Sequence, residues 1–262
     1  MAFRTANPAF NQNFFNTSEV VASPAQAMTV QGTIYKTALL TAMAMATAIF
    51  VWYRFYTAFH TPGLTAEQAV SAAISAAMPW MIGGLIGGVV LGLITAFAQK
   101  AAPITAPLYA LAEGLFLGGV SAFFELKYPG IVAPAIGLTF GTLMVMLMLF
   151  TTRIVRVTDK FRAGILMATG AIALLYLATF ILGFFSIEIP YIHGSGPIGI
   201  GFSVVVVVIA AANLLLDFDF IEKGAEAGLP RHMEWYGAFA LLVTLVWLYL
   251  EILRLLAKLR DR

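Results

Sequence analysis

The sequence predicts an all-α polytopic membrane protein, a bundle of seven transmembrane helices. Of its 262 residues, 61% are hydrophobic and only 11% are charged, whereas soluble domains carry about 25% charged and 45–50% apolar residues. The apolar residues fall in repeated runs of about 20, long enough to cross roughly 30 Å of hydrocarbon as helix. Such runs favour helices over a barrel, because a helix satisfies its backbone hydrogen bonds within the segment.

The first two predicted spans cover residues 34–53 and 72–97, and the loop between them, 54–70, contains Pro62-Gly63. Lys36 lies at the start of the first span, where a long side chain can reach the headgroups. The second span carries glycines spaced by four along one helix face, which lets a neighbouring backbone approach closely. These glycines are Gly83, Gly84, Gly87, Gly88 and Gly92.

The third predicted span covers residues 104–124, and Glu113 lies ten residues into it, near the membrane midplane. An ionisable side chain inside the membrane marks a functional site by default. A structural hydrogen bond to a neighbouring helix is the alternative, and the sequence leaves both open. A turn at Glu125–Gly130 leads to the fourth span, residues 131–150.

The segment 151–162 is the most basic part of the chain and sets the expected topology. It holds Arg153, Arg156, Lys160 and Arg162, so the positive-inside rule places it in the cytoplasm. The remaining spans are 164–185, from Pro197 into the acidic stretch at Asp217, and 235–258. This arrangement puts the N-terminus inside and the C-terminus outside, with nine Lys and Arg residues on inner segments and six on outer ones. A re-entrant last helix would instead return the basic tail to the cytoplasm.

The flanking segments complete the domain organisation. Residues 1–33 form a polar leader without the pattern of a cleaved signal peptide, and it is either a mobile segment or a regulatory arm. Residues 34–258 form the membrane domain, and residues 259–262 form a basic tail.

Composition also excludes several functions. A net charge of +2 is too small to indicate a nucleic-acid partner, and the chain has no cysteine for disulfides, thiolate metal sites or nucleophiles. His60, His193 and His232 lie in separate predicted loops without the spacing of zinc proteases. We therefore expect no enzymatic activity and no cofactor, with membrane lipid around the chain.

The carboxylates of the last two spans are the main candidates for a functional site. Asp217 and Asp219 lie about 200° apart on a helical wheel, so we expect Asp217 to face the bundle interior and Asp219 to lie nearer the inner water interface. Glu251 lies inside the last span. Carboxyls buried together change charge state near physiological pH, and ionised they are ligands that Ca²⁺ prefers. The alternative is an acidic helix end in water, with Lys223 as its partner.

At these residues the sequence resembles the Bax inhibitor-1 family, the transmembrane BAX-inhibitor-motif proteins with YccA-like bacterial members. The resemblance covers about residues 30–260 and is sharpest at Asp217–Ile221, Leu248–Ile252 and Glu113-Gly114. It implies a bacterial inner-membrane protein whose C-terminal helix is central in the bundle. It also implies a calcium leak latched by a carboxylate pair, whose positions Asp217 and Glu251 occupy, with Asp219 and Glu113 as further ion-binding or pH-sensing candidates.

Two functions follow from this resemblance. The first is a pH-sensitive Ca²⁺ leak, with Ca²⁺ or protons as transient ligands, which low pH closes because protonation removes the repulsion within the pair. The second is an interaction protein that modulates a membrane-embedded protease, a role that the polar leader would suit. The two carboxylates of the expected pair are 34 positions apart, and ideal helices leave them offset by roughly 10 Å along the axis.

Overall fold

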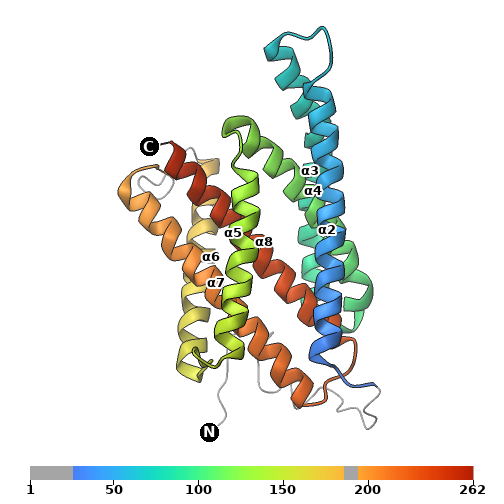
Figure 1. The fold of residues 1–262 in the computed structure, drawn as a ribbon, viewed down its shortest axis with the longest axis vertical. Coiled ribbons are helices and arrows are strands. Elements are labelled where there is room, and N and C mark those ends of the chain that lie inside the picture. Colours follow the sequence, from blue (N-terminus) through green and yellow to red (C-terminus); the bar gives the residue numbers. More distant parts are fainter. Residues whose placement is uncertain (1–25, 186–193, 262) are drawn as a thin grey trace. The chain divides into compact units, whose positions relative to one another are not determined.

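The computed structural model describes residues 26–185 and 194–261 (Figure 1). In these ranges seven helices are long and apolar enough to cross a membrane, which confirms the predicted all-α class. They are α2 (Val30–Phe59), α3 (Ala66–Phe97), α4 (Ala102–Lys127), α5 (Val132–Thr151), α6 (Asp159–Phe184), α7 (Pro197–Glu226) and α8 (Met233–Arg260), with a short 3₁₀ turn, η3 (Gln99–Ala101), before α4.

Several helices extend beyond the predicted spans, because capping residues rather than hydropathy set their ends. The side chain of Thr29 accepts a hydrogen bond from Gly32 N and starts α2 at Val30, so the helix includes the last residues assigned to the polar leader. Thr65 and Gln68 form a capping box at the start of α3. The predicted loop 54–70 therefore shrinks to residues 60–65. Most of the leader, residues 1–25, lies outside the described residues.

The described chain forms two compact units. The first comprises residues 26–123 with 220–242, and the second comprises residues 124–185, 194–219 and 243–261. Helices α4, α7 and α8 contribute to both units. Helix α8 is the most deeply buried of the seven spans in the described ranges. In its apolar stretch 61% of the residues are buried, against 6% in the apolar stretch of α6. This burial is what a central C-terminal helix would show.

In the first unit, the glycine face of α3 packs against α4. A Cβ built on Gly84 would lie 2.5 Å from Ala112 O and 2.6 Å from Phe116 N, and a Cβ on Gly88 would lie 2.7 Å from an oxygen of Glu113. The predicted close contact along this face is therefore confirmed. Gly83 is the exception, because nothing lies within 4 Å of its Cβ position.

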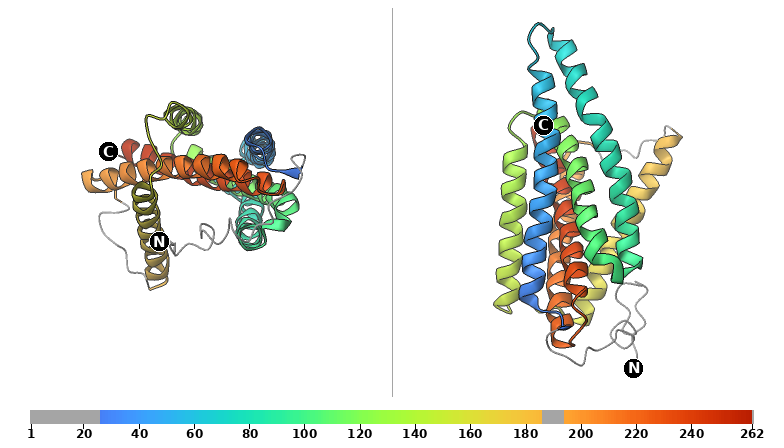
Figure 2. Two further views of the ribbon diagram at one scale, coloured as in Figure 1. Left: turned by 90° about the horizontal axis from the view of Figure 1, so that it is seen from below. Right: turned by 90° about the vertical axis from the view of Figure 1, so that its right-hand side faces the viewer.

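The opposite face of α4 packs just as closely against α2. A Cβ on Gly118 would lie 2.6 Å from Ala48 O, and Thr47 Oγ1 donates a hydrogen bond to Leu111 O at 2.9 Å. Small residues thus let α4 pack closely against both α2 and α3. Figure 2 shows α2 (blue) and α3 (cyan) side by side, joined by the 60–65 turn.

Candidate functional site

Helices α7 and α8 run antiparallel in the second unit, and two hydrogen bonds fix their register (Figure 2). Thr244 Oγ1 donates to Asp217 Oδ2 at 2.6 Å, and Lys258 Nζ donates to Ser203 Oγ at 2.9 Å. Fourteen residues separate the two contacts on each helix. Glu251 lies midway between Thr244 and Lys258 on α8, seven positions from each. At 1.5 Å per residue, it is about 10 Å along the axis from the level of Asp217.

Asp217 is buried where α7 meets α8. The residue is 8% exposed, as is Thr244. Next to it, the ring of Phe218 packs against Phe150 of α5 at 5.7 Å between centroids. The group that binds the Asp217 carboxyl is a neutral hydroxyl, so nothing in this contact offsets a negative charge.

Asp219, which we expected nearer the inner water interface with only Asp217 facing the bundle interior, is also buried against protein. It is 5% exposed and forms an ion pair with Arg162 in the first turn of α6. The prediction assumed that α7 has one protein-facing side, but all residues from Leu214 to Ile221 are buried. Opposite faces of the helix therefore both meet protein, and Arg162 neutralises the carboxylate on the second face.

Glu251 is held by a cation and a hydroxyl. Its Oε1 accepts hydrogen bonds from Tyr176 Oη of α6 at 2.9 Å and from Arg254 Nη1 at 2.7 Å. Arg254 also donates to the Tyr176 hydroxyl at 2.8 Å, and its guanidinium lies 5.0 Å from the centre of that ring. Glu251 is 1% exposed, and its Oε2 has no hydrogen-bond partner among the described residues.

Asp217 and Glu251 thus have different partners, and the structure does not join them by a hydrogen bond. The axial offset of about 10 Å equals the one expected from ideal helices. Sequence reasoning identified the carboxylates but missed their partners Thr244, Tyr176 and Arg162. Only Arg254 could have been predicted, because its spacing of three residues from Glu251 places both on one helix face.

Glu113 lies in the first unit. It is half-buried on α4, its carboxyl faces Gly88 of α3, and Tyr109, one turn earlier, forms a hydrogen bond with it. The ring of Tyr109 packs on Phe239 of α8 at 4.9 Å between centroids. The structural alternative considered for Glu113 was a hydrogen bond to a neighbouring helix, whereas the partner in the structure, Tyr109, lies on the same helix.

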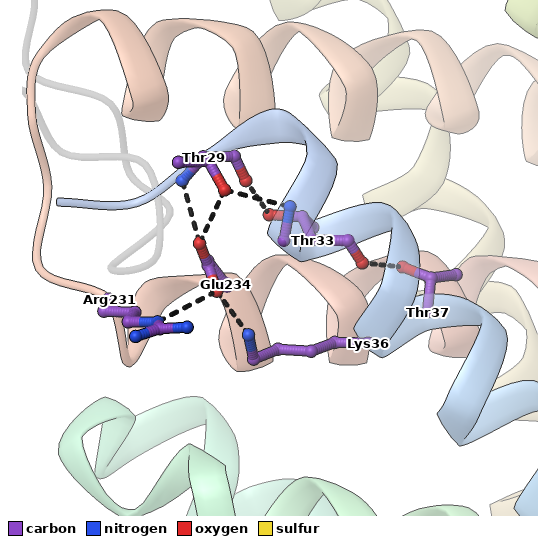
Figure 3. Close-up of polar contacts among 7 residues, drawn as sticks. Thr29, Thr33, Lys36, Thr37, Arg231 and Glu234 are labelled. Atoms are coloured by element: carbon purple, nitrogen blue, oxygen red, sulfur yellow. Dashed lines mark hydrogen bonds and ion pairs between the residues drawn. The ribbon is translucent and has the colours of Figure 1, made fainter. Parts of the chain in front are cut away.

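A second polar cluster, which the sequence analysis missed, lies at the start of α2 (Figure 3). Glu234, in the first turn of α8, forms an ion pair with Lys36. It also accepts hydrogen bonds from the backbone N–H and the hydroxyl of Thr29, both at 2.9 Å. A Cβ on Gly32 would collide with this carboxylate. Lys36, expected to reach the headgroups, is therefore paired with a buried carboxylate.

The same end of α8 is tied to the segment before α2. Met28 N donates to Leu229 O at 2.6 Å, and Arg231 N donates to Gln26 O at 2.9 Å. An isolated antiparallel β-bridge joins Ala27 to Pro230 between these two bonds. The turn between α7 and α8 therefore holds the start of α2 through backbone and side-chain contacts.

Within residues 26–185 and 194–261, no three His, Asp or Glu side chains gather closely enough to hold a metal ion. In comparisons with known proteins, the family model described as Bax inhibitor 1 like matches residues 7–261. The match covers nearly the whole chain. Neither the curated proteins nor the solved structures gave a match.

Proposed function

The chain belongs to the Bax inhibitor 1-like family, and from this premise and its seven apolar helices we propose that it is a pH-sensitive calcium leak in a bacterial inner membrane. The observation that carries the proposal is the burial of three carboxylates, Asp217, Asp219 and Glu251, on helices that are long and apolar enough to cross a membrane. Such groups are costly in hydrocarbon and mark ion pathways. Their oxygens are the ligands that Ca²⁺ prefers.

Asp217 is the proposed pH-sensing group. Asp219 and Glu251 each have an arginine partner, whereas Asp217 is bound by a hydroxyl. Deprotonation of Asp217 therefore places an uncompensated charge between α7 and α8, and an unpaired buried charge costs several kcal/mol. High pH should weaken this contact and open the path, and low pH should close it. This direction of the pH dependence is the one expected from the sequence. The proposed cause differs, because it is the burial of one charged carboxylate rather than repulsion between two.

The test is ⁴⁵Ca²⁺ flux into proteoliposomes across a pH series. Asp217→Asn, which is nearly isosteric and cannot ionise, should flatten the pH dependence. Asp219→Asn is the matched control two residues away, and it should keep the pH dependence. Equal flattening in both variants would contradict the assignment to Asp217.

The same assay distinguishes a shared latch from two separate contacts. If Asp217 and Glu251 act as one unit, the double variant Asp217→Asn/Glu251→Gln should do little more than either single change. Separate partners about 10 Å apart along the axis predict nearly additive effects, because additivity holds for groups without shared contacts. Additivity would support independent contacts, and saturation would support the pair.

The proposed orientation places the start of α2 and the basic segment 151–162 in the cytoplasm. Helix α8 is one continuous helix from Met233 to Arg260, about 40 Å long at 1.5 Å per residue, so a re-entrant path is not needed. The C-terminus then lies outside. A periplasmic reporter fused after Ile192 should be active and one fused after Val157 silent, and the reverse pattern would invert the assignment.

The alternative function is modulation of a membrane-embedded protease. It depends mainly on the polar leader, of which residues 1–25 lie outside the described residues. Calcium flux separates the two functions, because a protein that only binds a partner need not conduct. A folded protein with no flux at any pH would favour the alternative. We propose no catalytic role for either function.

A further inference from the structure

A cavity of ≈ 390 Å³ lies in the first unit beside the start of α2. Figure 3 shows four of its lining residues, Thr29, Lys36, Arg231 and Glu234. Helices α2 and α8 both begin here, at Val30 and Met233, and both are apolar enough to cross a membrane. In the proposed orientation both helices begin on the cytoplasmic side of the membrane, which places the cavity near the headgroups of that leaflet. Its lining residues are Ala27, Thr29, Gly32, Tyr35, Lys36, Arg231 and Glu234.

The charges around this cavity leave one cation in excess. The carboxylate of Glu234 is 2% exposed and already binds Lys36 and both donors of Thr29. Since Glu234 satisfies the N-terminus of α2 and cancels Lys36, neither offers a strong site to a ligand. Arg231 is paired less closely, because its Nε forms an ion pair with a Glu234 oxygen at 4.0 Å while its side chain is 72% exposed. The guanidinium therefore adds a positive charge to a cavity that is otherwise balanced.

The lipid-facing wall also fits an interfacial ligand. Tyr35, on the first turns of α2, is 67% exposed, and the ammonium of Lys36 lies 5.3 Å from the centre of the Trp235 ring. Tyrosine and tryptophan are enriched at the membrane–water interface, where one end of the side chain is wet and the other apolar. A ligand here would have an anionic head beside Arg231 and an apolar tail along α2.

We propose that this cavity binds the phosphate of an anionic phospholipid headgroup, with Arg231 as its principal contact. A guanidinium presents paired N–H donors that match phosphate oxygens. Basic pockets between transmembrane helices are known sites for such headgroups. A zwitterionic lipid fits less well, because its ammonium would need a carboxylate and Glu234 is buried and paired.

The test is native mass spectrometry of the full chain in detergent, titrated with equal amounts of phosphatidylglycerol and phosphatidylcholine. The protein should retain phosphatidylglycerol in preference. Arg231→Gln should weaken its binding about fivefold, which is about 1 kcal/mol, the contribution of one basic residue near an anionic surface. Arg231→Glu should weaken it further. Arg156→Gln is the matched control, an exposed arginine outside the cavity, and should retain the lipid as the parent does.

Three outcomes would overturn the proposal. Unchanged lipid binding in both Arg231 variants would show that the cavity is not the site. An equal loss in Arg156→Gln would show a general charge effect. Displacement of phosphatidylglycerol by inorganic phosphate at millimolar concentration would show that a soluble anion, not a lipid, occupies the cavity. Because Arg231 is mostly exposed, its variants should keep the parent's thermal stability, which a scan on the same samples checks.

Discussion

The contact between α3 and α4 depends on one glycine in a way that adjacent positions can test. At Gly84 an added methyl would lie 2.5 Å from Ala112 O and 2.6 Å from Phe116 N, while at Gly83 it would meet nothing within 4 Å. Both obstructing atoms at Gly84 belong to the α4 backbone, which cannot rotate aside. Gly84→Ala must therefore push the helices apart, whereas Gly83→Ala adds a methyl in open space.

The magnitude follows from two opposing terms. Replacing glycine by alanine inside a helix gains about 0.5–1 kcal/mol in both variants, so this gain cancels when they are compared. Overpacking costs about 1–3 kcal/mol and affects only Gly84→Ala. For chains of about 150–250 residues, each kcal/mol shifts Tm by about 2–4 °C. The apparent Tm of Gly84→Ala should thus lie about 2–12 °C below that of Gly83→Ala.

Differential scanning fluorimetry in one detergent, at one scan rate, measures this difference. Gly87→Ala provides an intermediate case, because its methyl would meet Ala112 Cβ at 3.4 Å, a contact that small adjustments relieve. The expected order of Tm is Gly83→Ala highest and Gly84→Ala lowest. Equal Tm values for all three would refute the conclusion that α3 and α4 are in close contact at Gly84.

The buried polar contacts give three further tests. Glu234→Gln should lower the stability by about 1.5–3 kcal/mol, the range for a hydrogen bond to a charged group, because Lys36 loses its partner; an unchanged Tm would contradict the ion pair. Arg162→Gln should lower the stability, by at most about 3–5 kcal/mol, because it removes the cation that Arg162 supplies to the buried carboxylate of Asp219, and adding Asp219→Asn should recover part of the lost Tm. Tyr176→Phe should cost about 1 kcal/mol, because it deletes a hydroxyl that the structure shows both donating and accepting; a parental Tm would argue against that contact.

The number and order of the helices could be predicted because each span needs about 20 apolar residues, and such runs are plain in the sequence. Their ends could not be placed from hydropathy. The first helix continues to Phe59, past the predicted end at Tyr53, since a helix that leaves the hydrocarbon keeps its hydrogen bonds. Its start is set by the Thr29 cap, which a hydropathy profile does not detect.

The carboxylates of the candidate site could be predicted individually from the sequence, but their contacts could not. Asp217 and Glu251 stand out because charge is scarce in apolar segments. Their partners depend on the register of neighbouring helices, and Thr244 and Tyr176 carry no sequence mark that distinguishes them from other lipid-compatible residues. The cluster around Glu234 was missed for a different reason, since it joins the start of α2 to the start of α8, about 200 residues later in the chain.

The charged face of α8 bears on how this protein enters its membrane during synthesis. Glu251, Arg254 and Lys258 lie in the last half of the helix, and a single charge costs about 2.5–3.5 kcal/mol at the bilayer centre on insertion scales. Their partners Tyr176 and Ser203 lie on α6 and α7, which the ribosome makes earlier. Those helices can already be in the bilayer when α8 arrives, so its charges meet hydroxyls there instead of lipid. Because α6 and α7 precede α8 in the chain, they can assist the insertion of α8 into the membrane.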